Sequence, residues 1–265
     1  MSWPAAQTPK KLRFRTFRTV AALMLREMAS TYGRSPGGYI WAILEPALGI
    51  ALLSIVFRLI LRTPSLGDNF PYFYATGLLP YAFYASISNQ IAASIRYSKP
   101  LLTYPAVTFI DALLARFLFN ALTQFMVMFI VLSGIIIGFN IRPLMDWPAV
   151  FMAVAMMVAI TVSVGVMNCY LFNAWPVWQQ IWGVVTRPMF ILSGVLFIPE
   201  DVPEVYRGWM MYNPLVHVTS EMRKGFFGTY EAVYVRPGYV FVISAVLIIF
   251  GLLLLLRNHK DLLQR

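Results

Sequence analysis

Charge is scarce in this sequence. Only 12% of the 265 residues are charged and 59% are hydrophobic. In an average soluble domain about 25% of the residues are charged and about 45–50% are hydrophobic. Polar residues are therefore too few to cover the surface of a water-soluble globule. The same balance excludes a disordered chain, which needs low hydrophobicity and high charge. We predict an integral membrane protein.

Cysteine and histidine are also rare. The one cysteine, Cys169, excludes an intrachain disulfide, and the two histidines are His217 and His259. His217 and Glu221 are four residues apart, so they could share a helix face. This pair could be half of a metal site or a local hydrogen-bonded pair. We favour the hydrogen-bonded pair, because no second histidine lies at metal-ligand spacing. We expect no bound metal.

None of the five lysines follows a glycine. The chain thus lacks the Gly-Lys-Ser/Thr run with which a Walker-type loop holds nucleotide phosphates. The longest segment outside the apolar stretches, residues 199–237, is too short for a soluble catalytic domain. We expect no ATP hydrolysis and no cofactor in this chain.

Six apolar stretches are present, each near the roughly 20 residues that a helix needs to cross a bilayer. They are residues 39–61, 72–95, 113–139, 148–172, 177–198 and 238–256. Period-two alternation is weak in all of them, which favours helices over a β-barrel. We predict one all-α membrane domain over residues 1–265, with six spans.

The net charge of +10 is concentrated at few places. Seven basic residues precede Pro36, and others lie in the loop after the second stretch and in the C-terminal tail, whereas the opposite side mixes bases with acids. The positive-inside rule therefore places both termini in the cytoplasm. Residues 19–25 are too short an apolar run for a signal peptide. We expect these charges to set topology rather than to bind nucleic acid.

Three segments are not plain spans. Residues 12–32 form a basic amphipathic pattern, typical of a helix in the membrane interface that anchors the chain, guides an anionic lipid head group or contacts a partner. The loop 96–111 places leucines and a tyrosine between Pro100 and Pro105, which suits either a short helix docked on another protein or a membrane-skimming turn.

The third segment is residues 199–237, on the outer side. Asn213-Pro214 is typical of an N-cap followed by proline at the first helical position. The helix should run from there to Gly225, after another short helix within 202–211. Their aromatic residues favour a re-entrant pair, because irregular backbone at membrane depth must be covered by protein.

Charges inside the spans are functional candidates by default. Glu45 precedes Pro46, Arg58 is near the outer end of its span and can snorkel, and Arg187 is near the middle of the fifth span, where it is a candidate to line a polar path. Aromatic residues crowd the second span, Tyr81 and Tyr84 among them. They form either interfacial belts and packing or a surface over which sugar rings slide.

Several runs resemble a known family. They are Arg26-Glu27, Tyr32-Gly33-Arg34-Ser35, Gly38-Tyr39-Ile40-Trp41-Ala42, Leu44-Glu45-Pro46 and Asn213-Pro214-Leu215-Val216-His217 with Glu221, Arg223, Phe226 and Phe227. With the length and the six-span layout, these runs resemble permease subunits of ABC-2 type exporters, most closely those of group 2 capsular polysaccharide exporters. The chain departs from many relatives after the fourth span, where Asn173-Ala174-Trp175-Pro176 replaces an Arg-Asp pair.

The resemblance implies a homodimer bound to two copies of a separate ATPase subunit that holds ATP and Mg. Residues 12–32 would be the interface helix. Residues 98–105 would be the coupling helix, with Ser98, Lys99, Leu101, Leu102 and Tyr104 as contact candidates. Residues 199–227 would be re-entrant helices that cap the exit, with a motif of Asn213, His217, Glu221 and Arg223.

The resemblance also implies a substrate, an acidic capsular polysaccharide on a lipid anchor, moved across a bacterial inner membrane toward periplasmic co-polymerase and outer-membrane export proteins. The candidate conduit residues are Arg26, Arg34, Glu45, Tyr81, Tyr84 and Arg187. The alternatives are an exporter of another lipid-linked glycan such as O antigen or teichoic acid, a membrane-embedded glycosyl- or acyltransferase, and an ion-coupled secondary transporter.

Overall fold

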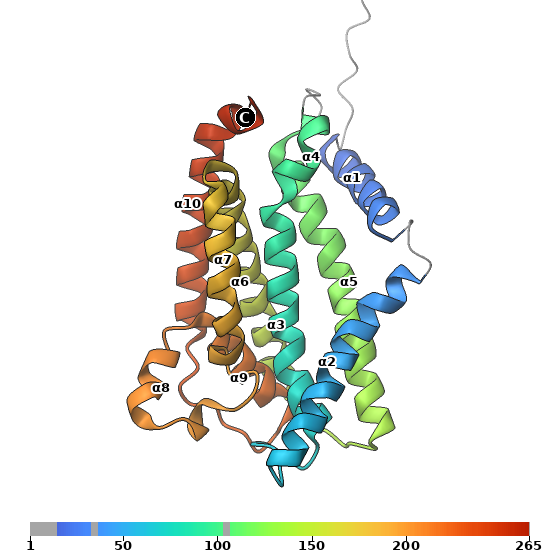
Figure 1. Ribbon diagram of the computed structural model, residues 1–265, viewed down its shortest axis with the longest axis vertical. Coiled ribbons are helices and arrows are strands. Elements are labelled where there is room, and N and C mark those ends of the chain that lie inside the picture. Colours follow the sequence, from blue (N-terminus) through green and yellow to red (C-terminus); the bar gives the residue numbers. More distant parts are fainter. Residues whose placement is uncertain (1–14, 33–36, 103–106, 265) are drawn as a thin grey trace, which may run out of the picture.

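The computed structural model describes residues 15–32, 37–102 and 107–264, and these residues form helices and short connections without a β-strand (Figure 1). The elements are α1 (Arg15–Tyr32), α2 (Gly38–Ile60), α3 (Phe70–Ala92), α4 (Ser94–Leu102), α5 (Phe109–Gly138), α6 (Trp147–Ala174), α7 (Pro176–Leu192), the 3-10 helix η1 (Pro199–Asp201), α8 (Glu204–Met210), α9 (Pro214–Phe226) and α10 (Pro237–Gln264). The all-α prediction is confirmed.

Four of the described helices are long and apolar enough to cross a membrane. They contain the candidate spans Ile40–Ile60, Phe109–Gly138, Trp147–Ala174 and Pro237–Asn258. Helices also form at the other two predicted spans, but α7 has only 17 residues and α3 carries polar side chains such as Asn89 and Gln90. For α3 and α7, membrane crossing stays a prediction.

The long helices run alternately up and down in one bundle (Figure 1). The end labelled C lies with α1, α4 and the α6–α7 turn, and α8 and α9 lie at the opposite end. α3 and α6 are central, because α6 packs against α3, α9 and α10. A Cβ at Gly165 would lie 2.8 Å from the Cβ of Ile91, so glycine permits the close approach of α6 to α3.

α2 and α7 are peripheral. α7 has no buried residue, and on α2 only Ile50 and Ser54 are buried among the side chains that the structure describes. Large apolar side chains therefore remain exposed on both helices, for example Leu52 and Val184. In a membrane protein such faces meet lipid or another subunit.

The amphipathic helix predicted over residues 12–32 is confirmed from Arg15 onward as α1. Its Val20 and Leu23 pack against Ala115 of α5, with Leu101 of α4 at the edge of this cluster. α1 therefore lies against the side of the bundle near one end (Figure 1). Residues 33–36, between α1 and α2, lie outside the described residues.

The segment 96–111 is more helical than predicted. α4 begins at Ser94, directly after Ala93, the C-cap of α3, so the short helix starts four residues before the predicted Ser98. α5 begins at Phe109 rather than near Leu113, because Thr108 and Asp111 form a capping box. The Asp111 amide donates to Thr108 Oγ1 at 3.2 Å, and the Thr108 amide donates to Asp111 Oδ2 at 2.9 Å.

Candidate functional site

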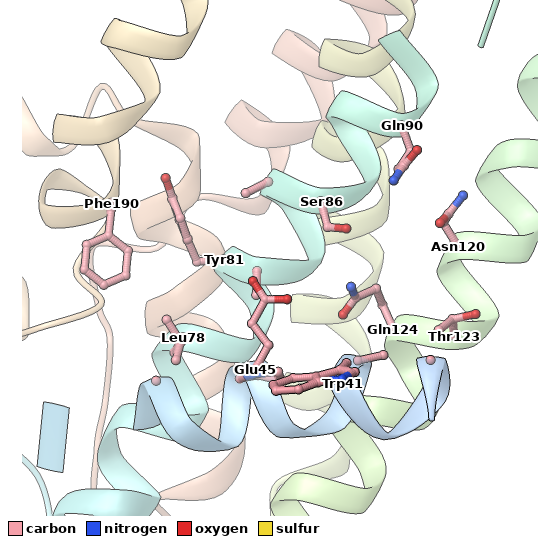
Figure 2. Close-up of a pocket in the computed structure, with 16 residues that line it drawn as sticks. Trp41, Glu45, Leu78, Tyr81, Ser86, Gln90, Asn120, Thr123, Gln124 and Phe190 are labelled. Atoms are coloured by element: carbon pink, nitrogen blue, oxygen red, sulfur yellow. The ribbon is translucent and has the colours of Figure 1, made fainter. Parts of the chain in front are cut away.

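A cavity of about 790 Å³ lies between α2, α3 and α5, with Phe190 of α7 at its edge. Its α2 wall includes Trp41, Glu45 and Pro46, which recur at helical spacing along one face of that helix. Figure 2 shows the Glu45 side chain rising from α2 into the space. Among the described residues that line this cavity, Glu45 is the only charged one.

Hydroxyl and amide groups make up the rest of the polar lining. They come from Tyr81, Ser86, Gln90, Asn120, Thr123 and Gln124. Gln90 and Asn120 point toward one another at one end of the cavity (Figure 2). Neutral donors and acceptors of this kind exchange hydrogen bonds with many hydroxyl groups. Together with the rings of Trp41 and Phe190, they suit a ligand with polar edges and apolar faces.

Tyr81 joins this cavity to α7. Its hydroxyl donates to the carbonyl of Thr186 at 3.0 Å, and its ring meets that of Phe190 edge-on at 5.3 Å. Tyr84 is buried beside it, with ring centroids 6.3 Å apart, and does not reach the cavity surface. Of the two tyrosines proposed for the conduit, the structure thus brings one to the cavity.

The arginines proposed for the conduit lie elsewhere. Arg187 is exposed on α7 and Arg26 is exposed on α1, with its guanidinium carbon 5.3 Å from the ring centre of Tyr97. Neither contributes to the cavity lining. Arg34 falls outside the described residues.

A buried ion pair lies beside the amide end of the cavity, and sequence reasoning missed it. Arg116 Nε of α5 is 3.0 Å from both carboxylate oxygens of Glu27 on α1, and the two side chains are 7% and 6% exposed. Arg116 Nη1 also donates to the side-chain oxygen of Gln90 at 3.0 Å. The available signal was Arg116 itself, a charge inside a predicted span without an assigned partner.

Four of the five coupling candidates lie on α4, at the end of the bundle near both α1 and the C-terminus (Figure 1). Ser98 is buried, and Lys99 is half-buried. Leu101 and Leu102 are half-buried and pack onto clusters of this chain's own core rather than projecting outward. Tyr104 falls outside the described residues.

Arg96 links α4 to the α6–α7 turn. Its guanidinium donates to Gln179 Oε1 at 3.1 Å and to the carbonyl of Phe172 at 3.4 Å. The two helices that flank residues 173–176 therefore both contact α4.

The re-entrant motif lies at the other end of the bundle. Asn213 caps α9 as predicted, because its Oδ1 accepts from the Leu215 amide at 3.0 Å. Arg223 is fully buried and donates to the carbonyls of Gly194, Val195 and Phe197, at 2.5, 2.8 and 3.1 Å. α9 is thereby fastened to the turn that follows α7.

The predicted hydrogen-bonded pair of His217 and Glu221 is wrong. His217 Nε2 lies 3.0 Å from the carbonyl of Met211, and Nδ1 accepts from the Arg236 amide at 3.3 Å. Both ring nitrogens are thus engaged by backbone groups outside α9. Burial lowers the pKa of His217 and raises the pKa of Glu221. No metal-binding cluster occurs among the residues that the structure describes.

The sequence profile of the ABC-2 type transporter family matches residues 18–227. The polysialic acid transport protein KpsM of Escherichia coli is 26% identical over 245 residues, covering 92% of this chain and 95% of that protein.

Two further relatives are capsule polysaccharide export inner-membrane proteins. CtrC of Neisseria meningitidis serogroup B is 27% identical over 245 residues, and BexB of Haemophilus influenzae is 25% identical over 249 residues. Each match covers 92% of both chains. The match to the family profile runs from within α1 to Phe227, the residue directly after α9.

Proposed function

This chain belongs to the ABC-2 type transporter family, and from that premise we propose that it is the membrane subunit of an ATP-driven exporter of lipid-linked acidic capsular polysaccharide. Its relatives are inner-membrane permeases named for capsule export. The name of the Escherichia coli relative specifies polysialic acid, a polymer whose sugars carry carboxylates. The proposal extends this substrate class to the present chain.

The cavity between α2, α3 and α5 carries the proposal. Its hydroxyl and amide groups match the many hydroxyls of a sugar chain, and Trp41 and Phe190 offer aromatic faces. Each contact of this kind is weak, with a net value of about 0.5–1.5 kcal/mol. A surface of many weak contacts holds a polymer without trapping it, as a conduit requires.

A second copy of the chain completes the conduit in this proposal. α2 and α7 border the cavity, and both expose apolar faces that the other described residues leave uncovered. Pairing two such faces would enclose a path between copies.

Arg26, Arg34 and Arg187 would then guide carboxylate or phosphate groups toward this path. Replacing each with glutamine should therefore lower surface capsule without loss of assembly. If all three variants export capsule normally, these arginines only set the orientation of the chain in the membrane.

Two copies of an ATPase subunit, with ATP and Mg bound to them, are proposed to dock at the α4 end. That end carries α1, the C-terminus and the half-buried Lys99 (Figure 1). α4 follows α3 after one residue and touches α5, so a push on α4 moves two walls of the cavity. We place this end in the cytoplasm, and α8 and α9 at the periplasmic exit, facing the co-polymerase and outer-membrane export proteins.

The test is to replace Lys99 with glutamate and Tyr104 with aspartate. Leu101 is a poorer site, because it packs against α1 and α5 and its loss would disturb this chain's own fold. We expect the double variant to assemble with the ATPase more weakly and to lower surface capsule about tenfold. The readouts are co-purification of the ATPase, ATPase rate in proteoliposomes, and surface capsule.

The matched control is Arg142→Glu, a charge reversal at an exposed position in the α5–α6 loop at the opposite end of the bundle. It should leave ATPase assembly unchanged. Unchanged export in the Lys99 and Tyr104 variant would refute the docking assignment.

A further inference from the structure

Three contacts from α3 and α4 hold the guanidinium of Arg116 without any involvement of α1. Its Nη1 donates to the carbonyl and to the side-chain oxygen of Gln90 on α3, at 3.2 and 3.0 Å. The ring of Tyr97 on α4 lies beneath it, with the ring centre 3.9 Å from the guanidinium carbon. Arg116 is therefore positioned by the bundle itself, whichever group occupies its remaining side.

The remaining side is occupied by a carboxylate from α1. Glu27 accepts from Arg116 Nε at 3.0 Å, and its Oε1 lies 3.5 Å from the side-chain nitrogen of Asn120. This is the only ion pair in the described part of the chain. An arginine flanked by an amide donor is a general receptor for carboxylate and phosphate groups. The geometry is that of an anion site with an internal anion in it.

This site adjoins the cavity. Gln90 and Asn120, which surround the ion pair, are also two of the residues that line the cavity. The only charge in the described lining is the acid Glu45, which repels anionic sugars. An acidic polymer therefore needs a cation at the cavity, and Arg116 is the buried cation adjacent to it.

We propose that Glu27 masks a substrate anion site formed by Arg116, Asn120 and Gln90. When α1 moves away from α5, a carboxylate of the glycan or a phosphate of its lipid anchor replaces the Glu27 carboxylate on Arg116. The exchange keeps Arg116 paired throughout, which avoids the large cost of a buried unpaired charge. This inference rests on the proposed function and names the group that recognises acidic substrate.

The experiment measures oligosaccharide binding to the permease–ATPase complex in nanodiscs by titration calorimetry. One probe is a glucuronic acid oligosaccharide, and the other is the same oligosaccharide with its carboxylates reduced to alcohols. Glu27→Gln removes the competing carboxylate, so we expect about tenfold tighter binding of the acidic probe and no change for the neutral one. Glu231→Gln, an exposed acid outside the site, should change neither.

The double variant Glu27→Gln with Arg116→Gln removes the pair without leaving an unpaired charge, so it should still assemble. We expect it to bind the acidic probe no more tightly than the neutral one. The charge-exchanged variant, Glu27→Arg with Arg116→Glu, should also assemble but should not prefer the acidic probe, whereas a purely structural pair would leave both assembly and that preference intact.

The outcomes separate the two proposals. Equal binding of the acidic probe by wild type and Glu27→Gln, or a preference for it that survives in the double variant, overturns the anion site and leaves the glycan conduit standing. Failure of wild type to bind either probe overturns both. Adding phosphatidic acid to the nanodiscs identifies the source: competition with the acidic probe assigns the site to lipid phosphate, and its absence assigns the site to sugar carboxylate.

Discussion

Two arginines are buried at opposite ends of this bundle, and they are held differently. Arg116 faces a carboxylate on another helix, next to a cavity. Arg223 faces three backbone carbonyls and the ring of Phe73, whose centre is 4.1 Å from its guanidinium carbon. Burial lowers the pKa of Arg223 to about 10, so it remains charged at neutral pH.

The two arginines differ in whether their hydrogen-bond partners can move away from them. Backbone carbonyls of the turn after α7 cannot move away from Arg223 without unfolding that turn, so Arg223 fastens two segments permanently. Glu27 belongs to α1, which packs on the side of the bundle through a small cluster of Val20, Leu23 and Ala115. Its carboxylate can leave with its helix. A buried arginine is structural in the first setting and exchangeable in the second.

Arg223→Met should give the largest effect. It leaves three buried carbonyls without donors, each worth about 1–3 kcal/mol, and we expect a loss of roughly 3–5 kcal/mol in the free energy of unfolding. Thermal unfolding of the detergent-solubilised protein, followed by tryptophan fluorescence, measures it. If this variant melts like wild type, the contrast between the two arginines fails.

Gly77→Ala supplies a second measurement at the same place. A Cβ there would lie 2.8 Å from Arg223 Nη2 and 3.1 Å from the carbonyl oxygen of Val195, so we expect about 1–3 kcal/mol of destabilisation. Gly134→Ala is the matched control, because a Cβ at that position has no described atom within 4 Å other than those of its chain neighbours and its own helix backbone.

A double-mutant cycle on Glu27 and Arg116 should give an intermediate effect. Each single change to glutamine leaves one buried charge unpaired and should loosen α1 by about 2–3 kcal/mol. The double variant should recover part of that loss, with a coupling energy of about 1–3 kcal/mol. Hydrogen exchange of the α1 amides reports the loosening. Strict additivity of the two single losses would mean that the pair does not hold α1.

The pH dependence contributed by His217 should be the smallest effect. Burial lowers the pKa of His217 below its usual 6.5, with Arg236 acting in the same direction and the Met211 carbonyl opposing. The unfolded chain therefore takes up the proton first, so stability is full above pH 6.5 and falls as the pH decreases below it.

His217→Gln should reduce the dependence of stability on pH, measured as melting temperatures between about pH 7 and pH 5. Glu221, whose pKa is raised by burial, contributes with the opposite sign and is common to both proteins. An unchanged slope in the variant would show that His217 does not titrate between the two states.

Local sequence signals predicted much of the fold. Asn213-Pro214 marked the start of α9 correctly, because capping depends on neighbouring residues alone. Apolar runs located α2, α5, α6 and α10, because hydropathy is also a local property of the sequence. The start of α4 was missed because Ser94 follows α3 almost without interruption, and no proline or glycine separates the two helices in sequence.

The site was harder to predict because its parts are distant in sequence. Glu45 and Tyr81 were identified as a charge and an aromatic residue inside spans, and both line the cavity. Glu27 and Arg116 are 89 residues apart, and their pairing depends on where α1 docks, which no periodicity encodes. The exposed Arg187 shows the converse, since a charge inside an apolar run need not face a cavity within its own chain.

The α6–α7 turn also bears on how the chain enters the membrane during synthesis. Trp175 is both the C-cap of α6 and the N-cap of α7, so the two helices form a hairpin with a single residue between them. α6 is long and strongly apolar, whereas α7 has 17 residues and buries none of them in the bundle. We expect the translocon to release both helices as one unit. α6 would then promote the insertion of α7, which would insert poorly alone.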